Sequence, residues 1–136
     1  MTIRKIIVLV YSVLFLISFF TIELIYPKEH VSVILTKEDS GSVLEIVVGD
    51  FFVIELEGNP STGFWWHFDN FDEKFLEVIR QETKKTSEKR LGAPVLGRWI
   101  LKAKKCGETA IKMVYYRQWE GADEAVDRVS FTIRIR

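Results

Sequence analysis

Cysteine and histidine are scarce in this chain of 136 residues, which contains one cysteine and two histidines. A lone cysteine, Cys106, excludes an internal disulfide framework and a cysteine-rich zinc site. His30 and His67 form no ligand cluster in the sequence, so we expect no metal and no other cofactor. Cys106 precedes Gly107 in a predicted turn, without a histidine pattern to activate it, and we expect a buried, unreactive thiol.

The chain also lacks an excess of charge of either sign, because 19 Lys and Arg balance 19 Asp and Glu. No net electrostatic field therefore attracts nucleic acid, which we exclude as a partner. Hydrophobic residues, by contrast, make up 48% of the chain, and the aromatic residues include four Trp, four Tyr and ten Phe. This length and composition suffice for one domain with a hydrophobic core.

A long apolar run spans Ile6–Ile22 and follows the basic pair Arg4 and Lys5. A helix that is hydrophobic all round is not an ordinary soluble helix, so residues 1–27 are predicted to be a signal peptide or a signal anchor. No Ala-x-Ala cleavage pattern follows the run, and its length approaches the ~20 residues that span a bilayer, which favours an uncleaved anchor. The basic pair keeps the amino end cytoplasmic.

We therefore expect this segment to engage the membrane or the secretion machinery. The folded domain is then extracytoplasmic: secreted, periplasmic or lumenal, or membrane-anchored with the domain outside.

Residues 31–136 read as short β-strands separated by turn signals. In the clearest of them, residues 129–135, apolar and polar side chains alternate. Eight such runs are expected at residues 31–36, 43–48, 51–56, 64–68, 75–81, 98–104, 109–116 and 129–135. The polar stretch Glu82–Arg90 is expected to be a solvated, mobile loop. No convincing helix follows the apolar run, so the pattern predicts an all-β fold, an antiparallel sandwich of about seven or eight strands.

Gly58–Gly63 connects two of these strands and precedes three consecutive aromatic residues. Pro60 fixes its own φ and biases the residue before it towards an extended conformation. The glycines at both ends permit positive φ, and the Ser and Thr hydroxyls between them can bond to nearby backbone. The segment is a short, pre-shaped and uncharged turn, and a plain strand connection is the alternative interpretation.

Two further connections are expected beside this one. On the predicted strand order, Asn59–Gly63, Leu91–Gly97 and Arg117–Trp119 are separated by even numbers of strands, so they lie at one end of the sandwich. Arg and Trp are the side chains most enriched in binding hot spots. Trp119 as a filler of the core is the alternative, because tryptophan is buried on average.

Ser61, His67 and Asp69 have the residue types of a hydrolase triad. Adjacent positions in a sequence are not triad geometry, and no independent feature marks His67 as a base. We therefore expect no enzyme and no catalytic residues.

The three loops resemble those of the chagasin family, inhibitors of papain-like cysteine proteases. Asn59-Pro60-Ser61-Thr62-Gly63 differs from the family's Asn-Pro-Thr-Thr-Gly only by serine for threonine. Gly92-Ala93-Pro94-Val95 stands where the family has Gly-x-Gly-Gly, keeping the first glycine, and Trp99 follows in the aromatic position. Arg117-Gln118-Trp119 stands where the family has Arg-Pro-Trp. The resemblance covers about residues 31–136.

The resemblance implies an immunoglobulin-like sandwich, a monomer, that inhibits a cathepsin-type cysteine protease reversibly and tightly. The three loops would occlude the active-site cleft. The part of the first loop near Thr62 would lie against the catalytic cysteine and histidine of the protease. Trp119 would supply apolar area beside them, and Arg117 would brace its loop or pair with a protease acid.

Two other functions remain open on the residues alone. One is an extracytoplasmic adhesive or ligand-binding β-sandwich without protease inhibition, in which the aromatic tip docks a sugar or another protein. The other is a structural ectodomain, with Trp65, Trp66 and Trp99 in its core. Fold alone does not decide among these functions.

Overall fold

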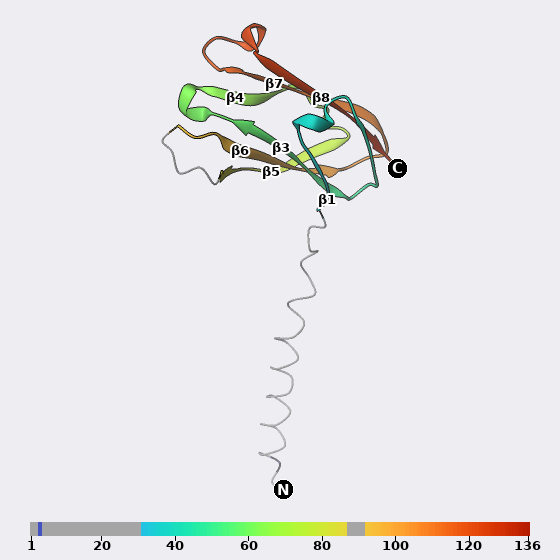
Figure 1. The fold of residues 1–136 in the computed structure, drawn as a ribbon. Helices are drawn as coiled ribbons and strands as arrows, with labels where there is room; N and C mark the ends of the chain where they lie inside the picture. Colours follow the sequence, from blue (N-terminus) through green and yellow to red (C-terminus); the bar gives the residue numbers. More distant parts are fainter. Residues whose placement is uncertain (1–2, 4–30, 87–91) are drawn as a thin grey trace.

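The computed structural model describes residue 3, residues 31–86 and residues 92–136 (Figure 1). The signal peptide or anchor predicted over residues 1–27 lies outside the described residues, apart from residue 3. Within the described part of the chain, no helix is long and apolar enough to cross a membrane.

In residues 31–86 and 92–136, eight strands form two sheets that face each other in two layers (Figure 1). The first sheet has the order β1 (Val31–Leu35), β3 (Phe51–Gly58), β6 (Val95–Ala103) and β5 (Leu76–Lys85). The second sheet has the order β2 (Val43–Ile46), β8 (Asp127–Ile135), β7 (Gly107–Arg117) and β4 (Phe64–Asn70). The expected all-β sandwich and its number of strands are confirmed.

The expectation of purely antiparallel sheets is wrong, because each sheet contains one parallel pair. β1 runs parallel to β3 with Leu35 opposite Ile54, and β2 runs parallel to β8 with Ile46 opposite Ile135. The chain passes from the first sheet to the second after β1 and returns after β2, so neither strand pairs with its neighbour in the sequence. Side-chain alternation identifies strands but carries no information about the direction of their partners.

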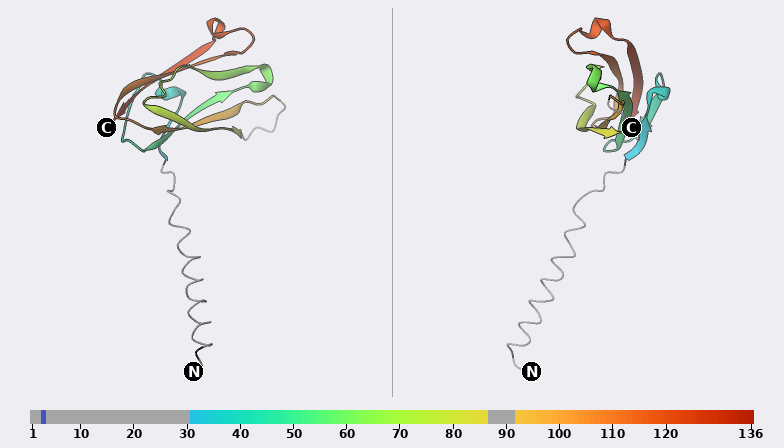
Figure 2. Two further views of the ribbon diagram at one scale, coloured as in Figure 1. Left: turned by 180° about the vertical axis from the view of Figure 1, so that it is seen from behind. Right: turned by 60° about the vertical axis from the view of Figure 1, so that its left-hand side comes forward.

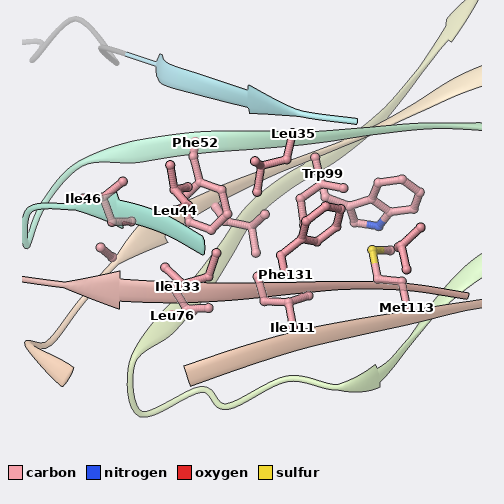
Figure 3. Packing of buried hydrophobic residues seen from close by; sticks show 14 of the residues in the cluster. Leu35, Leu44, Ile46, Phe52, Leu76, Trp99, Ile111, Met113, Phe131 and Ile133 are labelled. Carbon is pink, nitrogen blue, oxygen red and sulfur yellow. The ribbon is translucent and has the colours of Figure 1, made fainter. Parts of the chain in front are cut away.

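Burial follows the alternation of side chains along the strands. In β8, Phe131, Ile133 and Ile135 are buried, whereas the residues between them are exposed or half-buried. Figure 3 shows side chains from both sheets pointing into the space between the layers. The labelled members of this core are Leu35, Leu44, Ile46, Phe52, Leu76, Trp99, Ile111, Met113, Phe131 and Ile133.

Two glycines make room for aromatic rings near one end of the core. A Cβ at Gly58 would lie 2.7 Å from the Trp65 ring, and a Cβ at Gly97 would lie 2.7 Å from Trp99 and 3.0 Å from Trp65. Gly58 does not have the positive φ that the sequence suggested, since the positive value at this turn belongs to Gly63. Gly58 is needed for space, because a side chain there would collide with an indole.

The ends of β3, β5 and β7 and the start of β6 lie at the same end of the sandwich, away from the C terminus (Figures 1 and 2). The second connection is shorter than expected, because Val95 already belongs to β6 and lies opposite both Gly58 and Lys85. The polar stretch predicted from Glu82 onwards as a loop is part of β5 as far as Lys85, and its residues 87–90 lie outside the described residues.

Cys106 is exposed, so the expectation of a buried thiol is wrong. The residue lies in the turn between β6 and β7, beyond Ala103, the buried last residue of β6. A turn residue is shielded from solvent only where another segment of the chain packs over it, and the sequence does not show which segments do so.

Candidate functional site

The connection between β3 and β4 is a single 3₁₀ turn over Pro60–Thr62. The Thr62 N–H and Oγ1 both donate to the carbonyl oxygen of Asn59, at 3.0 and 2.8 Å, and Ser61 Oγ donates to Asn59 Oδ1 at 2.5 Å. Gly63 ends the turn with a φ of 84°. The turn is thus fixed by its own hydrogen bonds, as the Ser and Thr hydroxyls suggested, and its apex is exposed.

The turn is attached to the sandwich through β7. The Asn59 N–H donates to the Tyr115 hydroxyl at 2.9 Å, and the Tyr115 ring lies 5.4 Å from the Phe64 ring, centroid to centroid, in a stacked arrangement. Both rings are half-buried, and Tyr115 packs against the core. The first loop therefore starts and ends on side chains that are themselves packed.

The second loop is joined to the first by one hydrogen bond. Asn59 Nδ2 donates to the carbonyl oxygen of Gly92 at 3.1 Å. Gly92 is exposed with a φ of 79°, whereas Ala93, Pro94 and Val95 are half-buried. Among the predicted contact residues Gly92–Val95, only Gly92 is exposed, and a glycine offers backbone and no side chain to a partner.

Arg117 joins the third loop to the first. Its Nε donates to the carbonyl oxygen of Thr62 at 3.1 Å, and its Nη1 donates to Glu120 Oε1 at 3.0 Å. Its guanidinium carbon also lies 4.3 Å from the centroid of the Phe64 ring, a cation–π distance. Of the two roles expected for Arg117, bracing of the loops is the one that this geometry supports.

Trp119 is 72% exposed, so the alternative that placed it in the core is wrong. Its indole lies against Gly63, where a Cβ would be only 1.9 Å from Cη2 of the ring. Gln118 beside it is exposed as well. A large apolar side chain and a rigid, uncharged turn thus share one exposed surface, which we call the tip and which comprises Asn59–Gly63, Gly92 and Arg117–Trp119.

The tip has no catalytic arrangement. Ser61 Oγ is bonded to Asn59, while the His67 ring lies against Tyr116 at a tilt of 39°, with 4.4 Å between centroids. Buried His67 Nε2 has no hydrogen-bond partner, and burial lowers the pKa of this imidazole. No group of three or more His, Cys, Asp or Glu that could hold a metal occurs in residues 31–86 and 92–136.

Three contributors to the tip were not anticipated: Tyr115, Phe64 and Glu120. The contacts of Tyr115 and Phe64 depend on the register of β4 against β7, in which Phe64 lies opposite Arg117, whereas Glu120 contacts Arg117 within one turn. The one available sequence signal was Glu120, three residues after Arg117, a spacing at which a turn brings opposite charges together.

Comparison with known proteins decides the family. The model of the chagasin family peptidase inhibitor I42 matches residues 45–135, which include all three loops. The chain belongs to the chagasin family. Amoebiasin-2 of Entamoeba histolytica is 32% identical over 76% of this chain and 85% of its own length. Chagasin of Trypanosoma cruzi is 27% identical over 75% of this chain and 94% of its own length.

A solved structure supports the same relationship. The crystal structure of the cysteine protease inhibitor EhICP2 from Entamoeba histolytica superposes with a TM-score of 0.72 and 29% identity, over 79% of this chain and 98% of that one. Chagasin-family proteins are protease inhibitors and not enzymes. The expected family, inhibitory function and lack of enzyme activity are therefore confirmed, while the roles of single loop residues stay predictions.

Proposed function

We propose that this protein inhibits papain-like cysteine proteases of the cathepsin type by inserting its tip into the active-site cleft. The observation that carries the proposal is the contact between Trp119 and Gly63, which presents an exposed indole and a rigid turn side by side. We expect reversible inhibition, because the single cysteine of the chain, Cys106, lies in the β6–β7 turn and not at the tip, so no disulfide can join the tip to the catalytic thiol.

The geometry of the tip suits occlusion of a narrow cleft. The first loop is already ordered by hydrogen bonds, so little conformational entropy is lost when it docks. The side chains at its apex, Pro60–Thr62, carry no charge, so the apex enters a desolvated cleft without burying an unpaired ion. Trp119 supplies the large, rigid apolar contact that is typical of a binding hot spot.

Titration of papain and of a cathepsin with the purified protein tests the proposal. We expect inhibition at nanomolar concentrations or below that is recovered on dilution and competes with substrate. An absence of inhibition at tens of micromolar would favour an adhesive or ligand-binding function for the same aromatic surface. Size-exclusion chromatography with light scattering tests the expected monomer.

We also propose that residues 1–27 act as an uncleaved signal anchor that places the domain outside the cytoplasm. The basic pair before the apolar run supports the orientation with the domain outside the cytoplasm. The lack of a small-residue cleavage pattern supports an anchor that is not cleaved. Mass spectrometry of the mature amino terminus tests it: the anchor predicts an intact first segment, whereas a chain beginning after about residue 27 would contradict it.

A further inference from the structure

The chain enters the sandwich at the end opposite to the tip. Val31, the first residue of β1, lies opposite Phe51 at the start of β3, while β3 ends at Gly58 next to the first loop. Figures 1 and 2 show the C terminus at the same end as the start of β1. We call this end the base and define it by Val31, the turn Val47–Asp50, Lys104–Lys105 and Arg136.

An apolar turn projects from the base. The Asp50 N–H donates to the Val47 carbonyl oxygen at 3.0 Å and Asp50 Oδ2 accepts from the Val47 N–H at 3.1 Å, so the turn Val47–Asp50 is closed from both sides. Val47 and Val48 are nevertheless 57% and 42% exposed. Gly49 and Asp50 are the residue types usual in a surface turn, whereas Val47 and Val48 add exposed apolar area that a partner would cover.

Basic side chains flank this turn. The Gly49 N–H donates to the Ala103 carbonyl oxygen at 2.9 Å, and the Val48 N–H donates to the carbonyl oxygen of Arg136 at 3.0 Å. The exposed pair Lys104–Lys105 directly follows Ala103 and therefore lies at the same end of the sandwich as the valines. The Lys104 ammonium donates to the backbone carbonyl of Glu73, a bond that leaves its charge available to an anion. The base thus combines two exposed valines with two lysine amines, although it also holds the carboxylate of Asp50 and an Arg136 that is paired with Glu45. Apolar side chains and amines at one end of a domain suit the boundary between lipid tails and phosphate headgroups.

The length of the chain before the base supplies the second argument. Eight residues, 23–30, separate the apolar run that ends at Ile22 from Val31. Eight residues reach at most roughly 26–29 Å when fully extended. An anchored chain therefore keeps the base within the thickness of one small domain from the bilayer, where even weak contacts are populated because the local concentration is high.

We propose that the base docks on the headgroup region of the bilayer that holds Ile6–Ile22, with Val47 and Val48 entering the interface and Lys104 and Lys105 facing the lipid phosphates. The inference rests on the proposed anchor. Docking of the base would give the inhibitor a fixed orientation, with the tip on the side of the sandwich that faces away from the membrane. β7 alone has eleven residues, so the tip stands roughly 30 Å or more from the surface. A protease in the aqueous phase then reaches the loops without approaching the membrane.

Cys106 makes the experiment direct, because the single cysteine is exposed in the β6–β7 turn that also carries Lys104 and Lys105. The full-length chain is labelled there with an environment-sensitive fluorophore and reconstituted into vesicles of phosphatidylcholine and phosphatidylserine. A second sample carries the label at the tip end, at Ala122→Cys in a Cys106→Ser background. Nitroxide-headgroup lipids are then added to the vesicles as quencher.

Docking predicts that the label at Cys106 loses most of its fluorescence while the label at position 122 loses little. Val47→Asn with Val48→Asn should restore the Cys106 signal, whereas the matched change Val126→Asn, at an exposed valine near the tip, should not. Inhibition of papain by each variant in detergent confirms that it is folded.

Each remaining outcome contradicts a separate claim. A chain that fails to float with the vesicles would refute the proposed anchor, and the inference with it. A chain that floats with both labels unquenched, or with both quenched, would overturn the docking and leave the anchor standing. Quenching at Cys106 that survives the two asparagines would show that the valines are not the contact.

Discussion

Arg117 donates through Nε to the carbonyl oxygen of Thr62, so the third loop is bonded to the backbone of the first. The same guanidinium holds Glu120 and lies over the Phe64 ring. A planar guanidinium can satisfy these three partners together because its donors point in fixed directions, which a lysine ammonium does not reproduce.

Arg117→Lys should therefore weaken protease inhibition even though the charge is kept. We expect the inhibition constant to rise by about tenfold, the effect of losing one charged hydrogen bond of about 1.5 kcal/mol. Arg134→Lys is the matched control, because Arg134 also bonds two acids, Glu108 and Glu45, but on strands of the second sheet distant from the tip. Equal losses in the two variants would show that the bridge to Thr62 is not special.

Trp119→Ala should reduce binding without reducing stability. The exposed indole contributes little to the core, whereas a hot-spot tryptophan contributes about 2–4 kcal/mol to binding. Inhibition kinetics and urea denaturation measure the two quantities. Trp99→Ala, at a fully buried indole, should instead lower the free energy of unfolding by about 3–5 kcal/mol. An unchanged inhibition constant for Trp119→Ala would place this ring at the rim of the complex.

Gly63→Ala should displace the Trp119 ring. The new Cβ would lie 1.9 Å from Cη2 of the indole, and a φ of 84° adds backbone strain. Gly41→Ala is the control for backbone strain without a steric clash, because Gly41 has a φ of 89° and nothing lies within 4 Å of the added Cβ. Both variants should lose roughly 1–2 kcal/mol of stability. Only Gly63→Ala should lose inhibition, and retention of full inhibition would show that the indole position is not needed.

The stability of the domain should fall in mildly acidic solution, in part because of His67. Burial lowers the pKa of this imidazole in the folded state below its ordinary 6.5. The unfolded chain therefore binds the proton more readily, and stability that is complete above about pH 6.5 is lost as the pH falls towards the folded-state pKa. Buried Nε2 has no hydrogen-bond partner that could hold an added proton.

His67→Phe keeps an aromatic ring against Tyr116 and removes the titrating group. Urea denaturation at pH 7.5 and pH 5 should show a smaller loss of stability on acidification for the variant than for the wild type. Identical losses would assign the acid sensitivity to carboxylates elsewhere in the domain.

Strand positions and the meeting of the loops were predictable because both depend on local pattern. The alternation in residues 129–135 and the turn residues around Pro60 carry their own structural preferences. Even spacing in the strand order then brought Thr62 and Arg117 to one end, where they are bonded. The Asn-Pro-Ser-Thr-Gly and Arg-Gln-Trp segments are also local, so the sequence alone indicates the chagasin family.

Features that depend on long-range pairing were not predictable. The parallel pairing of Leu35 with Ile54 depends on where the chain crosses between layers, which no local pattern records. The hydrogen bond from Asn59 to the Tyr115 hydroxyl joins residues 56 positions apart and depends on the register of two strands. The exposure of Cys106 is likewise decided by which segments happen to cover a turn.

The loops are bonded to one another, through Asn59 to Gly92 and through Arg117 to Thr62. If one loop alone were exchanged to change the target protease, the residues that it had bonded in the other loops would lose their hydrogen-bond partners. Engineered or naturally recombined inhibitors on this scaffold are therefore expected to retain their activity only when the three segments are transferred as one set.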